Sequence, residues 1–180
     1  MRSMSLLLAL AAGPALATGL EIDVTGEAEG TIVIDLFEDV APAHVERITT
    51  LAERGAYDGV AFHRVIEGFM AQTGDVECAV AGAACPAGTG GSDMDDLPAE
   101  FSDLPFTRGV VGMARAQNPD SANSQFFIMF QEGAFLNGQY TVVGKVTSGL
   151  DVLDAIKLRQ GANGAVLGDP DRMAEVRVID

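Results

Sequence analysis

Arg64 is the residue whose setting most directly suggests chemistry, because it lies among apolar residues, close to Phe62 and Val65. The chain has 26 acidic and only 11 basic residues, so a cation in an apolar run is unusual here. A guanidinium group cannot escape burial by losing its proton. Arg64 is therefore either a rim residue paired with a carboxylate or a group that acts on a ligand.

Two later segments place amide side chains beside large apolar ones. A strand has a side-chain period of two, which puts Met70 and Gln72 on one face of one strand. The same period groups Gln125, Phe127 and Met129 on a second strand. An apolar floor with one arginine and two amides suits a neutral, extended ligand such as a peptide.

The alternative for such segments is that their large apolar residues only fill the core, and we expect this of Phe126, Ile128 and Phe130. The side chain of His63 points to the opposite face of the strand from that of its neighbour Arg64, so we expect His63 to be a hydrogen-bonded structural histidine. No Gly-x-Ser-x-Gly or comparable nucleophile context occurs in the sequence. Conventional nucleophilic catalysis is therefore not expected.

Metal and cofactor binding are not expected either. The two histidines, His44 and His63, have no ligand spacing with the two cysteines. The Gly-Thr-Gly-Gly run at 88–91 lacks the Lys-Ser/Thr continuation of a phosphate-binding loop. That run predicts a flexible turn.

Cys78 and Cys85 stand seven positions apart in a loop of small residues. In an oxidising compartment we expect them to form a disulfide. Closing so short a loop contributes about 2.5 kcal/mol on the chain-entropy account of disulfides. The alternative is a pair of free thiols.

The first 17 residues read as a cleaved export signal. Arg2 precedes a short apolar run, and Ala15-Leu16-Ala17 has the small-x-small form of a signal-peptidase site. The run is too short to span a bilayer, so no membrane contact is expected after cleavage. The alternative is a first strand or helix of the fold. On the export interpretation, residues 18–180 form one periplasmic domain.

The pattern along the rest of the chain predicts a mainly β protein. Proline opens a helix at 42–54, and a Ser148-to-Asp151 capping box precedes a second helix at 152–159. No strand-helix-strand rhythm occurs, which favours an antiparallel sheet closed into a barrel, with the helices capping it. The eight expected strands are 20–24, 31–37, 60–66, 69–72, 109–114, 125–130, 141–146 and 173–179.

The formal net charge of −15 excludes one class of partner and leaves others open. Binding to phosphate backbones depends on clustered Lys and Arg, so a nucleic-acid partner is not expected. No long apolar seam suggests an obligate partner, and we expect a monomer.

Five ordered motifs resemble those of the cyclophilin family of peptidyl-prolyl cis-trans isomerases. They extend over nearly all of the chain after residue 30, and their order makes the resemblance specific. It implies a closed eight-stranded barrel with two capping helices and a substrate groove on its outer face. The motifs are FHRVI at 62–66, GFMAQ at 68–72, GTGG at 88–91, GMAR at 112–115 and SQFFI at 124–128.

The resemblance also assigns roles to residues. It implies that Arg64 is the catalytic arginine and that Gln72 orients it. It further implies an apolar proline pocket and a groove wall that binds the preceding residues. The pocket residues are Phe69, Met70, Phe127 and Leu136, and the wall residues are Ala114, Arg115 and Gln125, with Phe135 and Tyr140 beside them.

Four positions depart from the best-known eukaryotic pattern. Arg115 replaces an asparagine and Tyr140 a histidine, which resembles bacterial exported members. Thr73 replaces a glycine. Phe135 replaces a tryptophan, so cyclosporin is expected to bind weakly at best.

The resemblance predicts an isomerase acting on proline-containing segments of unfolded or partly folded exported proteins, with no cofactor. A binding module or chaperone of the same fold, which recognises proline segments without isomerising them, is the main alternative. An acidic barrel that binds carbohydrate or ions is a weaker one, because no polar groups suited to sugars converge in the sequence.

Overall fold

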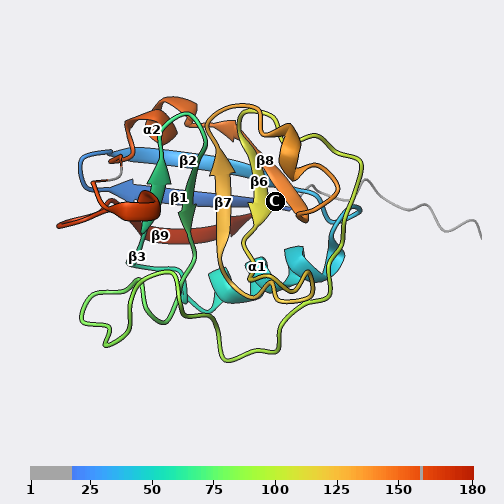
Figure 1. Ribbon diagram of the computed structural model, residues 1–180, viewed down its shortest axis with the longest axis horizontal. Coiled ribbons are helices and arrows are strands. Elements are labelled where there is room, and N and C mark those ends of the chain that lie inside the picture. The colour runs from blue at the N-terminus through green and yellow to red at the C-terminus, as the bar shows by residue number, and fades with distance from the viewer. Residues whose placement is uncertain (1–17, 159) are drawn as a thin grey trace, which may run out of the picture.

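The computed structural model describes residues 18–158 and 160–180, and the proposed signal at 1–17 lies outside them. The strands of these residues form one sheet, and two α-helices and two short 3-10 helices lie around it (Figure 1). The strands are β1 Gly19–Thr25, β2 Gly30–Leu36, β3 Val60–Ala61, β4 Arg64–Ile66, β5 Met70–Thr73, β6 Val110–Met113, β7 Phe126–Met129, β8 Val142–Ser148 and β9 Arg172–Ile179. The helices are α1 Pro42–Glu53, η1 Ala134–Leu136, α2 Leu150–Ala155 and η2 Ala162–Gly164.

The first hairpin forms as the alternation of its residues predicts. β1 and β2 pair antiparallel, with Leu20 opposite Ile34 and Ile22 opposite Ile32. All four side chains are at most 1% exposed, while the residues between them are partly exposed. One face of the hairpin therefore lies on the core.

The sheet is antiparallel throughout the described residues and has nine strands, one more than expected. Its order is β3-β9-β1-β2-β8-β6-β7-β5-β4, so it begins and ends on neighbouring stretches of the chain. The expected strand at 60–66 is divided at Phe62 and His63, whose backbone groups bond instead to Asp171 and Val166. The two edge strands of the sheet, β3 and β4, thus come from one segment, residues 60–66, and the sheet curls into the form of a barrel.

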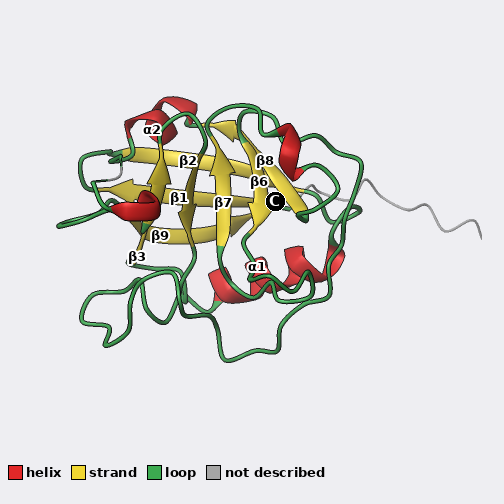
Figure 2. Ribbon diagram, in the orientation of Figure 1, coloured by secondary structure: helices red, strands yellow, loops and turns green. Residues whose placement is uncertain are grey.

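Both α-helices bury an apolar face against this curled sheet, and Figure 2 shows them on opposite sides of the strands. In α1, Val45, Ile48 and Leu51 are at most 2% exposed and join the main core. Pro42 lies in the first turn, where its missing N–H costs no hydrogen bond. The prediction for this helix is confirmed.

The predicted start of the second helix is wrong. α2 begins at Leu150 after Gly149, which has φ of 85° and provides no side-chain cap. Ser148 cannot cap it because Ser148 is still paired with Val33 in the sheet. The helix ends at Ala155, and Arg159 lies outside the described residues.

The long connection between β5 and β6 carries little regular structure (green to yellow-green in Figure 1). It contains the disulfide between Cys78 and Cys85, which confirms the expected pairing. A single bridge between Leu97 and Ala122 ties its middle to the loop before β7. Among the described helices, none has the length and apolar character to cross a membrane.

Candidate active site

Arg64 and Gln72 face the same side of the sheet because they are directly paired across β4 and β5. Gln72 is in turn paired with Phe127 of β7, and Met70 with Met129. The antiparallel register therefore brings the arginine, the amide and the apolar residues of three strands onto one surface. The face predicted from the period of two is confirmed.

The guanidinium of Arg64 is half-buried and held by neutral acceptors, two of them oxygen atoms and the third the Met70 sulfur. Its Nε donates to the carbonyl oxygen of Asn163 at 2.9 Å, and its Nη1 donates to Oε1 of Gln72 at 3.1 Å. Burial lowers the pKa of Arg64, although the guanidinium remains protonated because its usual pKa is so high. Within residues 18–158 and 160–180 no carboxylate forms an ion pair with it, so the interpretation as a paired rim residue is not supported.

The side-chain amides of Gln72 and Gln125 extend the hydrogen bonding from Arg64 to the glycine-rich run. Nε2 of Gln72 donates to Oε1 of Gln125 at 2.9 Å, and Nε2 of Gln125 donates to the carbonyl oxygen of Gly90 at 2.9 Å. Each amide thus accepts on one side and donates on the other. This directional chain fixes the orientation of both side chains and of the guanidinium.

A hollow of about 290 Å³ opens beside Arg64. It contains every groove residue expected from the sequence except Gln125, which instead lines a neighbouring hollow of about 410 Å³. Gln72, Ala114 and Arg115 line both hollows, so the two are continuous. The residues around the first are Arg64, Phe69, Met70, Gln72, Ala114, Arg115, Phe127, Phe135, Leu136 and Tyr140.

The floor of this first hollow is apolar and rigidly packed. Met70, Phe127 and Leu136 are at most 6% exposed and belong to one cluster. Phe106 stacks behind Phe127 with ring centroids 5.7 Å apart. Phe135, in contrast, is 66% exposed at the edge. The floor can therefore bind a small apolar ring without rearrangement.

Arg115 forms part of the wall through contacts that the sequence did not indicate. Its guanidinium carbon lies 4.4 Å from the centre of the Tyr140 ring. Its nitrogens donate to the carbonyl oxygens of Gln139 and Ala116. Arg115 is thus used to hold this wall together, and Arg64 differs from it in facing the apolar floor.

Sequence reasoning missed one direct partner of Arg64. Asn163 in η2 is 99 residues away and supplies the carbonyl for Nε, and it has φ of 55°. Left-handed backbone is more frequent for asparagine than for most non-glycine residues. The Asn-Gly pair at 163–164 is typical of a turn, but no local pattern places that turn beside β4.

His63 does not have the hydrogen bonds that were expected of it. The side chain is 7% exposed, and neither ring nitrogen has a partner among the residues that the structure describes. Burial lowers its pKa, against the opposing influence of the Asp75 charge. His63 is therefore a neutral buried side chain, and it lines neither of the two hollows.

The expectation that the glycine-rich run at 88–91 is a turn is confirmed, but hydrogen bonds to a buried side chain hold this turn in place. The backbone N–H groups of Gly88 and Gly90 both donate to the Asp75 carboxylate. They are therefore already occupied by an internal anion. Among the described residues no group of three or more His, Cys, Asp or Glu side chains could hold a metal ion.

Comparison with known proteins identifies the class of protein to which this fold and groove belong. The family described as "Cyclophilin type peptidyl-prolyl cis-trans isomerase/CLD" matches residues 20–178. The chain therefore belongs to the cyclophilin-type peptidyl-prolyl cis-trans isomerase family.

Individual relatives are consistent with this assignment. A Brucella suis protein named "Probable peptidyl-prolyl cis-trans isomerase" is 56% identical over 153 residues, which cover 83% of this chain and 78% of that protein. A Helicobacter pylori peptidyl-prolyl cis-trans isomerase is 42% identical over 134 residues, covering 72% of this chain and 76% of its own. A Cryptosporidium parvum cyclophilin crystallised in the presence of the dipeptide Ala-Pro has a TM-score of 0.77 and 25% identity, covering 90% of this chain and 99% of that one.

Proposed function

We propose that this protein accelerates rotation about X-Pro peptide bonds in unfolded segments of exported proteins, with Arg64 as the catalytic residue. One observation carries the proposal. A guanidinium oriented by Asn163 and Gln72 lies beside an apolar hollow, and among the described residues its Nη2 has no protein acceptor. A donor in that position suits a ligand that is apolar except at one atom.

The chemistry of a proline bond matches that description. Rotation is slow because the twisted bond loses amide resonance, over a barrier of about 18–20 kcal/mol. In the twisted state the nitrogen regains a lone pair that accepts a hydrogen bond, which the planar amide nitrogen cannot do well. A bond from Arg64 to that nitrogen would therefore stabilise the transition state more than the ground state.

The apolar floor would hold the proline ring while the bond turns. Met70, Phe127 and Leu136 are buried and closely packed, so the ring binds against a surface that is already formed. Shortening the time for one rotation from about 100 s to about 1 ms requires the barrier to fall by roughly 7 kcal/mol. One hydrogen bond is insufficient, so binding of the twisted geometry along the groove must contribute the rest.

Two features support a role outside the cytoplasm. The first 17 residues have the composition of an export signal, and Cys78 is joined to Cys85, a bond that persists in oxidising compartments. We propose the periplasm as the location, a monomer as the working form, and proline-containing segments of folding proteins as the substrates. Cyclosporin is expected to bind weakly.

A protease-coupled assay on a short Ala-Pro peptide tests the isomerase function. The protein should increase the rate of cis-to-trans conversion in proportion to its concentration. Binding of the peptide without acceleration would instead identify a proline-binding module of the same fold. The chain of hydrogen bonds from Arg64 through Gln72 to Gln125 favours the enzyme, because binding alone needs no oriented donor.

Mass spectrometry of the protein recovered from a native periplasmic fraction tests the location. Cleavage after Ala17 would leave Thr18 as the first residue. Detection of intact Met1 in that fraction, or absence of the protein from it, would contradict the proposed export.

A further inference from the structure

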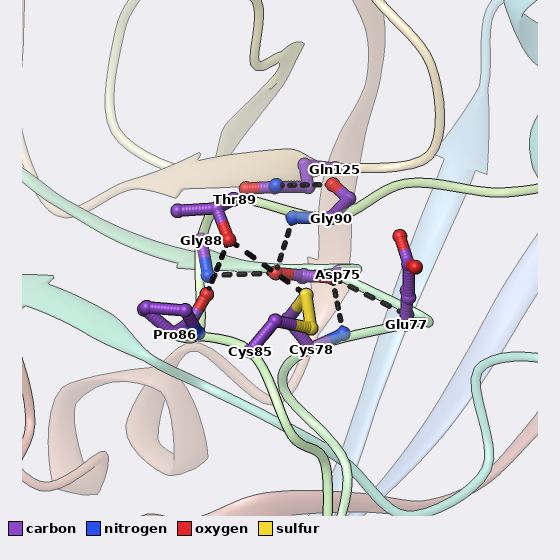
Figure 3. Close-up of a disulfide and its surroundings, with 9 residues drawn as sticks. All are labelled: Asp75, Glu77, Cys78, Cys85, Pro86, Gly88, Thr89, Gly90 and Gln125. Carbon is purple, nitrogen blue, oxygen red and sulfur yellow. Dashed lines mark hydrogen bonds between the residues drawn. A yellow bond between two sulfur atoms is a disulfide. The ribbon is translucent and has the colours of Figure 1, made fainter.

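The Asp75 carboxylate organises the glycine-rich turn beside the active site. Asp75 is fully buried and accepts four backbone N–H groups (Figure 3). Oδ1 accepts from Cys78 at 2.8 Å and from Glu77 at 3.3 Å, and Oδ2 accepts from Gly88 at 2.6 Å and from Gly90 at 3.1 Å. One carboxylate therefore joins the disulfide-bearing segment to the turn.

The disulfide packs directly against the same turn. Oγ1 of Thr89 lies 3.7 Å from Sγ of Cys78, and a Cβ added to Gly90 would lie 2.8 Å from that sulfur. The turn thus contacts the disulfide on one side and the Asp75 carboxylate on the other. Displacement of Cys78 would change both contacts.

Gly90 transmits the position of the turn to Arg64. Its N–H donates to Asp75, and its carbonyl oxygen accepts from Gln125. Gln125 in turn accepts from Gln72, whose own Oε1 accepts from Arg64. Three consecutive side-chain hydrogen bonds therefore link the turn to the guanidinium, and each of the two amides is held by a hydrogen bond at both of its ends.

The disulfide is the main restraint on the segment that follows Cys78. Residues 81–87 are mostly exposed, and within the described chain none of them forms a hydrogen bond to the barrel. Their bonds are local, from Ala83 to the Val80 carbonyl and from Thr89 to the Pro86 carbonyl. Without the bond between Cys78 and Cys85, this segment would be tied down only through its ends.

We propose that the Cys78–Cys85 disulfide is a redox-sensitive clamp that positions Arg64 through Asp75, Gly90 and the two amides. This inference rests on the proposed isomerase function. With the disulfide formed, the turn is held and the guanidinium is oriented. With the disulfide reduced, the turn loosens and turnover falls, while the apolar floor of the proline pocket, formed by Met70, Phe127 and Leu136, stays packed in its own cluster.

A dithiol reductant, either a small molecule or a thioredoxin-like protein, would carry out the reduction. Its thiolate attacks Sγ of Cys85, which is half-buried, and breaks the S–S bond, and the Cys78 sulfur leaves as a thiolate and takes up a proton. The second thiol of the reductant then displaces Cys85 as a thiol. Two cysteine thiols are formed, and the reductant is oxidised to its own disulfide.

The test compares turnover and binding in the oxidised protein, in protein reduced with dithiothreitol, and in the double variant Cys78→Ser/Cys85→Ser. The clamp predicts a fall of about tenfold in kcat/KM for an Ala-Pro peptide, in line with the cost of small misplacements of catalytic groups. It also predicts that the Kd of a proline peptide changes by less than about threefold, because the pocket floor is untouched. Reoxidation should restore the rate, which keeps the test valid if the double variant fails to fold.

Asp75→Asn and Asp171→Asn form a matched pair of further variants. Asp171 is also a buried carboxylate that accepts backbone N–H groups, from Glu27, Ala28 and Lys157, but it has no bond to the turn or to the amides. Both variants should lower the melting temperature. Only Asp75→Asn should lower kcat/KM at unchanged peptide Kd when both are measured well below their melting temperatures.

The results separate the inference from the function on which it rests. Absence of isomerase activity in the oxidised protein would refute the proposed function. Full activity in the oxidised protein and the same activity after complete reduction, verified by alkylation of both cysteines, would overturn the clamp. Equal losses of peptide binding and turnover on reduction would also overturn it, since they would indicate general loss of structure.

Discussion

Replacement of Arg64 by lysine separates charge from geometry at the proposed catalytic residue. The guanidinium is held in one orientation because Nε donates to Asn163 and Nη1 donates to Gln72, at 2.9 and 3.1 Å. An ammonium group retains the positive charge, but its three N–H groups radiate from one nitrogen and cannot reproduce the planar fork that spans Asn163, Gln72 and the hollow. Arg64→Lys therefore removes the oriented donor and leaves the groove otherwise unchanged.

The size of the effect follows from the bond that is lost. A hydrogen bond from a charged donor contributes about 1.5–3 kcal/mol, and each 1.36 kcal/mol of transition-state stabilisation corresponds to a factor of ten in rate. Arg64→Lys should thus lower kcat/KM by about one to two decades. Arg64→Ala also removes the charge and should lower it by about 10²–10³-fold, as removal of other oriented transition-state donors does.

Folding and binding should change far less. Arg64 is half-buried, and its partners in the described residues are uncharged, so Arg64→Ala should lower the free energy of unfolding by only about 1–2 kcal/mol. The protease-coupled assay gives kcat/KM, and titration with a proline peptide gives Kd. A loss that occurs in turnover and not in Kd identifies a bond made mainly in the transition state.

An Arg64→Ala variant that folds, binds and isomerises like the parent would refute this reasoning and leave Arg64 as a structural residue. A variant that loses binding and turnover equally would also contradict it, because the arginine would then stabilise the planar and twisted bonds alike. Denaturation by urea in parallel guards against an effect that comes only from unfolding.

Three further predictions concern other positions. Phe135→Trp should tighten cyclosporin binding by about one to two decades, because an indole N–H adds a hydrogen bond of about 1–3 kcal/mol at an edge where phenylalanine has no donor; an unchanged Kd by calorimetry would place the limitation elsewhere in the groove. The lowered pKa of His63 predicts a contribution to stability that is complete above its usual pKa of about 6.5 and declines as the pH falls, because the unfolded state then binds the proton more readily. His63→Asn should flatten the dependence of unfolding free energy on pH between 7 and 5, and equal slopes would count against this assignment. Gly112→Ala should lower the free energy of unfolding by about 1–3 kcal/mol and weaken proline-peptide binding, because its Cβ would lie 2.5 Å from the Phe106 ring and 2.6 Å from the Phe127 ring; an unchanged melting temperature would show that these rings move freely.

Local patterns in the sequence were sufficient for much of the fold and for the composition of the groove. The alternation in residues 20–24 and 31–37 predicts the first hairpin, and the period of two places Gln72 with Met70 and Phe127 with Met129. These predictions succeed because side-chain direction in a strand depends only on neighbouring residues. The ordered motifs add the identity of the family, which the match over residues 20–178 confirms.

Several features depend on contacts between distant residues and could not be predicted. The strand at 60–66 is divided because the backbone of Phe62 bonds to Asp171, and Ser148 fails as a cap because Val33 keeps it in the sheet. The turn at 88–91 is held by a buried carboxylate, although its glycines alone indicated flexibility.

Only the tertiary structure determines how Arg64 is oriented. Its presence in an apolar run was visible from the sequence, but its Nε acceptor comes from Asn163, 99 residues later, and the far end of its amide chain is the carbonyl of Gly90. Backbone carbonyls are identical at every residue, so a sequence carries no mark of which one will accept a given hydrogen bond. That choice is made when the sheet curls and brings η2 and the glycine-rich turn to opposite ends of the same row of side chains.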